Sequence, residues 1–558
     1  MEQTKLPLPL GSTDFKRICQ EYYYVDKTLL IKDLLDEKNS NILFTRPRRF
    51  GKTLNMDMIR TFFEKTDEDT SIYFQDKAIW KQGLQYTQHQ GQYPVIFLTL
   101  KDIKARKWET AYELIKMVIG AEYARHIELM DSDKISIVDS RTYKNIINGS
   151  ASLTDYMFSL VVLSKMLYDH HGKKPIIIID EYDTPIQEGF INGYYNEAVE
   201  FIRNFFSAAL KDNQNIMMSI MTGILRVAKE SIFSGLNNVR IDSVLDDRFS
   251  SYFGFTNEEI VAITKYYNVK EKAAQIRDWY DGYQFGDTEI YNPWSVINYL
   301  SNGYKAIPYW SQTSENTIIH EILKKYNEVT YKNLHNLLKE NGKVTSVVKT
   351  NIIYPKLKAP QTNILGFLLM TGYLKATKTT INEDGAYVCQ LNIPNKEIRT
   401  IYREEIISLL TAEVGEMTVE DLKDALLNKD SEAIKETLSR FMLRTISYYD
   451  GLRENYYHGL MLGLITIFEH THTVRSNRES GEGRYDIQLS PKNKALPGII
   501  IEIKAGEEGK HNLQQLAEVA LAQIEEKKYD TELCSQGINS IYKYGIAFAN
   551  KKVEIKTN

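Results

Sequence analysis

Apolar and polar positions alternate along the first third of the chain in a pattern that predicts a sheet covered by helices. Apolar runs with the length of strands occur at residues 40–45, 94–100, 175–180 and 216–222. The run PIIIID at 175–180 has no polar position before its last residue, which is expected only where both faces of a strand are covered. Residues 154–170 instead have apolar side chains at helical spacing. This alternation favours a parallel sheet with helices packed on it.

The middle and the end of the chain show different patterns. Residues 251–430 have mainly helical periodicity, with a hairpin-like pair of strands at 372–377 and 386–393, and predict a helical lid and connecting domain. The last part of the chain predicts a compact α/β domain. Its expected elements are a helix near 454–468, strands at 484–489 and 498–504, a helix at 512–528 and a strand at 545–549.

The composition is that of a globular protein in solution. Lys and Arg number 69 against 73 Asp and Glu, so nucleic acid would have to bind in a local groove and not on a polybasic surface. Cys19, Cys389 and Cys534 are far apart, which argues against a disulfide framework or a zinc site and favours a reducing cytoplasm. The chain begins without a signal-peptide pattern and has no apolar run of the roughly 20 residues that cross a bilayer. No membrane contact is therefore expected.

A phosphate-binding loop is the first chemical motif. The sequence RPRRFGKT follows the strand predicted at 40–45 and precedes a helix predicted at 53–64. In that context GKT is the end of a Walker A loop, in which backbone N–H groups hold phosphate, Lys52 reaches the β- and γ-phosphates, and the Thr53 hydroxyl binds Mg²⁺. Arg46 replaces the first glycine of the full motif. The predicted nucleotide-binding residues here are Arg46, Pro47, Arg48, Arg49, Phe50, Gly51, Lys52 and Thr53.

A Walker B motif is predicted where the strand at 175–180 ends. Asp180 would hold Mg²⁺ through water, and Glu181 would polarise the water that attacks the γ-phosphate. In a doubly wound sheet both loops lie at the carboxyl ends of the strands, where ligands bind. The alternative is a basic turn and an acidic strand end that never meet. ATP and Mg²⁺ are the predicted cofactors.

These blocks resemble a bacterial and archaeal AAA-ATPase-like family. The resemblance is carried by RPRRFGKT, IIIIDEYDTPI and TGILRVAKESIFSGLNN, with YVDKT at 24–28 and YNPWSVINYL at 291–300. It implies that Thr222 ends a sensor strand near the γ-phosphate. It also implies that Arg226 is a second phosphate sensor or an arginine finger, whereas the alternative for Arg226 is an arginine on a helix surface. Arg46 fits the form of the motif found in this family.

Two carboxylates and a lysine form a second candidate site near the C-terminus. Residues i and i+2 of a strand share a face, so Glu502 and Lys504 project together. Charged side chains inside an apolar strand are costly unless they are paired or bind an ion. A preceding antiparallel strand would bring Asp486 alongside. Asp486 and Glu502 could then hold a Mg²⁺ that orients water at a phosphodiester, with Lys504 stabilising the charge.

This pattern resembles the PD-(D/E)XK nuclease superfamily, and SNRESGEGRYDIQL resembles the nuclease domain often joined to the same ATPase family. Tyr485 stands where many members have proline. The resemblance implies a further ligand on the first helix of the domain, either His458 or Glu454. It also implies that Gln523 and Tyr529 are accessory groups of the active site.

The predicted fold is therefore α/β: a P-loop NTPase parallel sheet with a helical lid or linker region, and a C-terminal restriction-endonuclease-like α/β domain. The predicted domains are residues 1–250, 251–430 and 431–558. The expected function is an ATP-dependent or ATP-regulated nuclease that cuts nucleic acid, DNA foremost, in defence or mobile-element biology. Assembly into a homo-oligomer with nucleotide state is a further expectation. The alternative is a nucleotide-sensing scaffold whose nuclease fold binds nucleic acid without cutting it.

Overall fold

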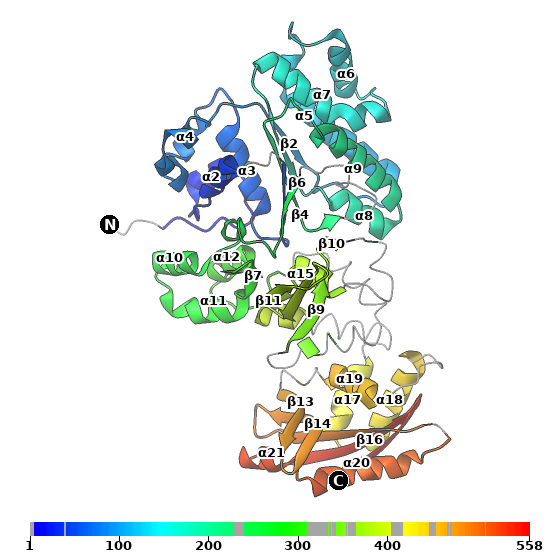
Figure 1. Ribbon diagram of the computed structural model, residues 1–558. Coiled ribbons are helices and arrows are strands. Elements are labelled where there is room, and N and C mark those ends of the chain that lie inside the picture. Colours follow the sequence, from blue (N-terminus) through cyan, green and yellow to red (C-terminus); the bar gives the residue numbers. More distant parts are fainter. Residues whose placement is uncertain are drawn as a thin grey trace. The chain divides into compact units, whose positions relative to one another are not determined.

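The structure, a computed structural model, divides into two compact units, Met1–Ile318 with Thr345–Ile398 and Ile319–Val344 with Arg399–Asn558 (Figure 1). It describes residues 5–37, 41–227, 239–310, 333, 336–337, 342–352, 354, 364–402, 417–445, 454–465, 468, 471–507 and 509–558. Among these residues no helix is both long enough and apolar enough to span a membrane. The predicted boundaries at 250 and 430 stay predictions.

Unit 1 is built on a five-stranded parallel sheet of order β2-β3-β4-β1-β6. Its strands are β1 (Asn41–Thr45), β2 (Val95–Thr99), β3 (Ile176–Asp180), β4 (Met218–Gly223) and β6 (Val239–Asp242). The predicted parallel α/β sheet is confirmed, and β6 is an addition to it. The sequence of β6, VRID, has no apolar run, and its first residues are only half-buried, so its pattern does not distinguish it from a loop.

Helices cover both faces of this sheet. In Figure 1, α3 lies on one side, and α5, α7 and α9 lie on the other. The helices of unit 1 are α1 (Phe15–Glu21), α2 (Leu29–Asp36), α3 (Lys52–Phe63), α4 (Leu84–Thr87), α5 (Trp108–Arg125), α6 (Ile137–Ile147), α7 (Leu153–His171), α8 (Thr184–Asn192), α9 (Tyr195–Leu210), α10 (Asn257–Tyr267), α11 (Ala273–Tyr280), α12 (Pro293–Ser301) and α15 (Ile364–Met370). Ile176, Ile177, Ile178 and Ile179 of β3 are fully buried between the two helical layers, as their uninterrupted apolar run predicts.

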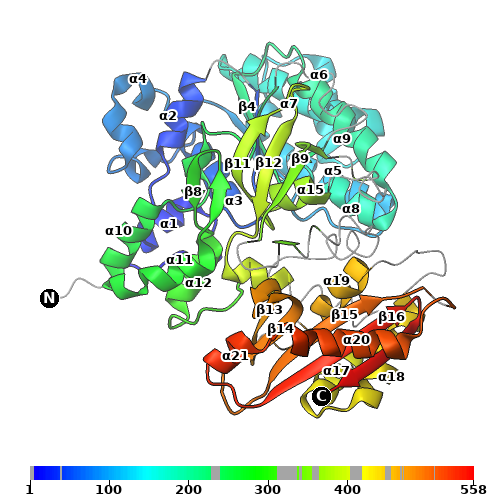
Figure 2. The ribbon, with the colours of Figure 1, turned by 60° about the horizontal axis from the view of Figure 1, so that its bottom comes forward.

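The middle of the chain contains several strands as well as helices, whereas the sequence predicted a mainly helical lid. The predicted hairpin is present as β11 (Lys375–Ile381) and β12 (Tyr387–Asn392), and β9 (Val344–Val348) adds a third strand to it (Figure 2). A smaller hairpin joins β7 (Tyr283–Phe285) and β8 (Thr288–Ile290). A short parallel pair joins β5 (Arg226–Val227) to β10 (Asn351–Ile352).

Unit 2 is a mixed five-stranded sheet of order β13-β14-β15-β16-β17, in which only β15 and β16 are parallel. Its elements are α17 (Met417–Leu427), α18 (Ser431–Thr445), α19 (Glu454–Ile465), β13 (His472–Ser480), β14 (Gly483–Pro491), β15 (Gly498–Ala505), α20 (Leu513–Glu526), α21 (Thr531–Ser535), β16 (Ile541–Ala549) and β17 (Lys552–Thr557). Ile501 and Ile503 pack with α18 and α19, whereas Ile500 packs with Ile524 of α20. The strand therefore has two different faces, and Glu502 is on the α20 side.

Candidate active sites

The phosphate-binding loop of unit 1 turns sharply between β1 and α3. Gly51 precedes α3 with a φ of 81°, and Arg49 has a φ of 70°, so the backbone enters the left-handed region at both positions. α3 then begins at Lys52. The first backbone N–H groups of a helix have no partner within it, and together with the helix dipole they attract phosphate.

The ends of β3 and β4 meet the start of α3 beneath this loop. The Thr53 hydroxyl donates to Asp180 Oδ2 at 2.7 Å, and the Thr222 hydroxyl donates to Asp180 Oδ1 at 2.5 Å. The sheet order β3-β4-β1 explains these contacts because it places the carboxyl ends of neighbouring strands at one edge. Asp180 is fully buried, and burial raises the pKa of its carboxyl group. A divalent cation beside this carboxylate would compensate for that cost.

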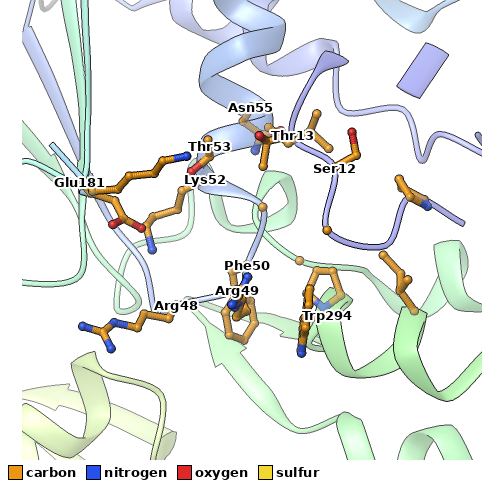
Figure 3. Close-up of a pocket in the computed structure, with 18 of the residues that line it drawn as sticks. Ser12, Thr13, Arg48, Arg49, Phe50, Lys52, Thr53, Asn55, Glu181 and Trp294 are labelled. Carbon is orange, nitrogen blue, oxygen red and sulfur yellow. The ribbon is translucent and has the colours of Figure 1, made fainter. Parts of the chain in front are cut away.

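Lys52 and Glu181 face a common space. The Lys52 ammonium donates to the carbonyl oxygens of Arg46 and Pro47 at 3.1 and 2.9 Å, and burial lowers its pKa. The Thr184 hydroxyl donates to Glu181 Oε2 at 3.4 Å. Lys52 and Glu181 line one cavity and are drawn together in Figure 3. A cation and a carboxylate in these positions suit a terminal phosphate and an attacking water, respectively.

The cavity has a volume of about 400 Å³, within the usual range for small-molecule sites. The phosphate-binding loop contributes Arg48, Arg49, Phe50, Gly51, Lys52 and Thr53 to its lining. Residues that sequence patterns did not identify complete it, among them Ser12, Thr13, Asn55, Lys101, Lys104 and Trp294. They come from separate parts of the chain and share no motif. The one signal available for Trp294 is its place in the YNPW block.

In unit 2, Asp486 and Glu502 lie on neighbouring antiparallel strands. The Asp486 N–H donates to Glu502 Oε2 at 3.3 Å, and Asp486 Oδ2 accepts from the N–H of Ile503 at 2.8 Å. The Lys504 ammonium donates to Glu502 Oε1 at 3.2 Å, so these two side chains do share one face of β15. At Asp486, β14 and β15 are therefore joined by hydrogen bonds between backbone N–H groups and side chains. The regular backbone pairing of the two strands runs from Ile487 to Leu489.

Gln523 and Tyr529 complete the surroundings of Glu502. Gln523 Nε2 lies in hydrogen-bonding contact with Glu502 Oε1 and is 3.1 Å from the Tyr529 hydroxyl. Glu502 is 2% exposed. Burial, reinforced by the negative charge of Asp486, raises the pKa of Glu502 to about 7. Burial and the negative charge of Asp486 therefore disfavour the anionic form of Glu502, and a bound cation would offset that cost.

Comparison with known proteins agrees with this division of the chain. Residues 9–233 match the family described as a predicted AAA-ATPase, and residues 452–558 match the PD-(D/E)XK nuclease superfamily. The chain joins an AAA-ATPase-like domain to a PD-(D/E)XK nuclease-superfamily domain. A relative from Azotobacter chroococcum mcd 1, described as an uncharacterized protein in the vnfD 5' region, is 23% identical over 500 residues, which are 86% of each chain.

In the AAA-ATPase-like domain, Arg46 and Arg226 are not among the cavity-lining residues described. The fully buried Arg46 guanidinium pairs with the Asp242 carboxylate and donates to the Asp242 carbonyl oxygen at 2.9 Å. It lies 5.0 and 5.3 Å from the ring centres of Phe253 and Phe285. Arg226 belongs to β5, a strand and not a helix. The Arg46 side chain therefore does not face this cavity, the predicted role of Arg226 stays a prediction, and Pro47 contributes its carbonyl oxygen to Lys52.

In the nuclease-superfamily domain, His458 contacts the backbone of Asp486. Its Nε2 is 3.1 Å from the Asp486 carbonyl oxygen and 3.3 Å from Ser476 Oγ. Glu454 begins α19, and its side chain lies outside the described residues. Within the described part of the chain, no group of three or more His, Cys, Asp or Glu side chains is arranged for a metal ion. Among the described side chains of this site, Asp486 and Glu502 carry carboxylate oxygens, the type of ligand that Mg²⁺ prefers.

Proposed function

We propose that the chain is an ATP-binding and ATP-hydrolysing protein whose C-terminal domain cleaves phosphodiester bonds in nucleic acid, DNA foremost. The contact set around Glu502 carries the nuclease part of this proposal. A buried carboxylate that accepts from an ammonium group and an amide, beside the negative charge of Asp486, is costly for stability alone, and it suits a site that binds a cation and a phosphate.

For ATP, the residues in and beneath the cavity have distinct tasks. Lys52 and the N-terminus of α3 bind the terminal phosphates, while Thr53 and Asp180 would hold Mg²⁺. That ion, when bound, neutralises charge that develops on the phosphates. Glu181 orients the attacking water, and Thr222 holds Asp180 in place by its 2.5 Å hydrogen bond.

For nucleic acid, Asp486 and Glu502 would hold Mg²⁺, which when bound lowers the pKa of a coordinated water. Lys504 stabilises negative charge on the phosphate. Gln523 and Tyr529 fix the position of the Glu502 carboxylate. His458, through its contact with the Asp486 carbonyl oxygen, holds the backbone that carries the second carboxylate.

The test uses the full chain on labelled DNA and RNA, with Mg²⁺ titrated and ATP present or absent. We expect Glu502→Gln and Lys504→Ala to reduce cleavage by orders of magnitude, because each removes a charge at the reacting phosphate. Glu518→Gln, which changes an exposed carboxylate of α20, is the matched control and should cut like the parent. Cleavage by Glu502→Gln at the parental rate would show that the active site lies elsewhere.

A rival function is a nucleotide-sensing scaffold that binds nucleic acid without cutting it. The observation in its favour is the absence, among the described residues, of a group of three metal-binding side chains. If the parent and Glu502→Gln bind DNA alike and neither cuts any substrate at any Mg²⁺ concentration, the scaffold is the correct function.

The proposed setting is the cytoplasm, where ATP and foreign or mobile DNA are both present. We further propose that the chain assembles with itself when ATP is bound. The mass of the particle in solution, measured with and without ATP for the parent and for Lys52→Ala, tests this. An ATP-dependent increase that Lys52→Ala lacks is expected, and an unchanged mass would contradict it.

A further inference from the structure

Glu181 has an unusual backbone for its place in the fold. Its φ is 53°, in the left-handed region that residues with a long side chain rarely enter. Asn268 also has a positive φ, of 59°, but it ends α10, where such a conformation is common. Glu181 instead directly follows the strand β3, which ends at Asp180. A strained backbone of this kind persists only where its surroundings hold it.

The neighbouring strand β4 fixes two successive N–H groups at this position. The Glu181 N–H donates to the Thr222 hydroxyl at 3.3 Å, and the Tyr182 N–H donates to the Thr222 carbonyl oxygen at 2.9 Å. The same hydroxyl donates to Asp180 Oδ1. The backbone on both sides of Glu181 is therefore tied to one residue of the next strand.

The two residues after Glu181 are fastened to the chain that leaves β4. Asp183 Oδ2 accepts from the N–H groups of Ile224 and Leu225 at 2.9 and 3.0 Å. The Tyr182 hydroxyl donates to the Leu225 carbonyl oxygen at 2.6 Å and accepts from the Val227 N–H at 3.0 Å. Both side chains are fully buried. Water therefore does not compete for these hydrogen bonds.

Gly223, the last residue of β4, allows this close approach. A Cβ at Gly223 would lie 2.6 Å from Tyr182 Cε1 and 2.8 Å from Asp183 Oδ1, so a larger residue would push both side chains away. The Gly223 carbonyl oxygen accepts from the Arg46 N–H at 3.1 Å, where the phosphate-binding loop begins. Tyr182 and Asp183 with residues 223–227 thus form a brace around the end of β4.

We infer that Asp183, together with Tyr182, holds Glu181 in its left-handed conformation and thereby positions the attacking water, an inference that rests on the proposed ATP hydrolysis. In that reaction the water oxygen bonds to the γ-phosphorus and the bond from this phosphorus to the bridging oxygen breaks. One water proton stays on the phosphate, and the other passes by way of Glu181 to the solvent. Asp183 is not among the cavity-lining residues described, so it is a positioning residue and acts through Glu181.

ATP turnover and ATP affinity, measured on the full chain with Mg²⁺, test this role. Asp183→Ala should lower kcat at least about tenfold while the Kd for ATP stays within about threefold of the parent, because misplacing Glu181 affects the reaction and not the phosphate contacts. Asp183→Asn keeps an oxygen that can accept from both N–H groups and should recover most of the rate. Asp155→Ala removes another aspartate that accepts from a backbone N–H, at 2.8 Å, and is the matched control with parental turnover.

The Glu181→Gln background shows whether Asp183 acts through that carboxylate. There Asp183→Ala should lower the remaining turnover by less than about twofold, because the group that it positions is already gone. An equal loss in both backgrounds, or a loss of ATP affinity that matches the loss of kcat, overturns the positioning role. A parent that binds ATP without turning it over contradicts the proposed hydrolysis itself, and the brace is then decided by unfolding.

Denaturant unfolding tests the brace without ATP. Glu181→Gly should unfold at a higher denaturant concentration than Glu181→Ala, because glycine adopts a left-handed backbone without strain. When Asp183→Ala is also present the order should reverse, since the backbone can then leave this conformation and glycine only adds entropy to the unfolded chain. Glu113→Gly and Glu113→Ala, on the helix α5, are the matched controls, and the alanine variant should be the more stable in both backgrounds. The same order at Glu181 with and without Asp183→Ala would overturn the brace.

Discussion

Arg46 occupies the position at which a full Walker A motif has glycine, and its surroundings give a physical reason for the difference. Its guanidinium is fully buried, is paired with Asp242 at the end of β6, and lies between two phenylalanine rings. The same residue offers its carbonyl oxygen to Lys52. Arg46 therefore anchors the loop to the edge strand of the sheet, while residues 48–53 remain to face the cavity.

The first prediction follows from the burial of this pair. Arg46→Gly restores the glycine of the motif but leaves Asp242 buried without its cation, so the free energy of unfolding should fall by about 3–5 kcal/mol. Arg46→Met combined with Asp242→Leu should recover most of that loss, because no buried charge is left unpaired. Denaturant unfolding of the parent, Arg46→Met, Asp242→Leu and the double variant measures the coupling. Additive losses would show that the pair does not anchor the loop.

The second prediction separates chemistry from stability at Glu502. Burial and the charge of Asp486 raise the pKa of Glu502 from 4.5 to about 7 in the folded protein. A raised folded pKa means that stability is lost as the pH rises from about 4.5 through about 7. Glu502→Gln removes this loss, so at pH 8 the variant should unfold no more easily than the parent although it does not cut. A variant that is inactive because it is unfolded at pH 8 would contradict this.

At the scale of the elements, prediction from sequence succeeded where a single sequence pattern determines the type of element or the face of a strand. The run IIIID predicts a buried strand, and β3 is one. The alternation in IEIK correctly predicts that Glu502 and Lys504 share one face of a strand. The edge strands β6, β13 and β17 were missed because their solvent-facing residues dilute the apolar pattern. The cavity wall at Ser12, Thr13 and Trp294 was missed because it forms only when distant segments meet. Arg46 was assigned to phosphate because its loop position does not reveal the burial of its side chain.

One buried carboxyl group joins several of these elements. Glu397 is fully buried and accepts from the Ser295 hydroxyl of α12 and from the Trp310 N–H, each at 2.9 Å. The Trp310 indole in turn donates to the Arg48 carbonyl oxygen at 3.4 Å. Glu397 therefore helps to hold both α12 and the phosphate-binding loop, from a position far along the chain.

The third prediction concerns the pH at which this group ionises. Burial raises the pKa of Glu397 from 4.5 to about 8. Because the folded pKa is the higher one, its contribution to stability is complete below about pH 4.5 and is lost as the pH rises towards 8, by roughly 5 kcal/mol at most. Glu397→Gln should remove this dependence. Unfolding followed at pH 6, 7, 8 and 9 checks it, with Glu109→Gln on α5 as the control. A parental slope in the Glu397→Gln variant would contradict it.

At the scale of the whole molecule, the described contacts of each candidate site lie within one unit. The contacts of Lys52, Asp180 and Glu181 are made inside unit 1, and those of Asp486 and Glu502 are made inside unit 2. A substitution can therefore remove one of the two proposed activities without changing the contacts of the other site.

The fourth prediction uses this separation. On the proposed function, Glu181→Gln keeps the groups that would bind ATP but loses the carboxylate that would orient water, so ATP should stay bound and turn over at least about 100-fold more slowly. We expect the response of the nuclease to ATP to persist in this variant and to be absent from Lys52→Ala. The measurement is ATP turnover and DNA cleavage on the same preparations. A Glu181→Gln variant that cuts as if ATP were absent would show that turnover, and not occupancy, controls cleavage.

The residues that follow β3 divide two tasks between them. Glu181 faces the cavity, whereas Asp183 Oδ2 accepts from the N–H groups of Ile224 and Leu225 at 2.9 and 3.0 Å, and the Tyr182 hydroxyl accepts from the Val227 N–H at 3.0 Å. Val227 belongs to β5, which pairs with β10. These hydrogen bonds and the pairing of β5 with β10 connect the end of β3 to a strand more than a hundred residues further along the chain.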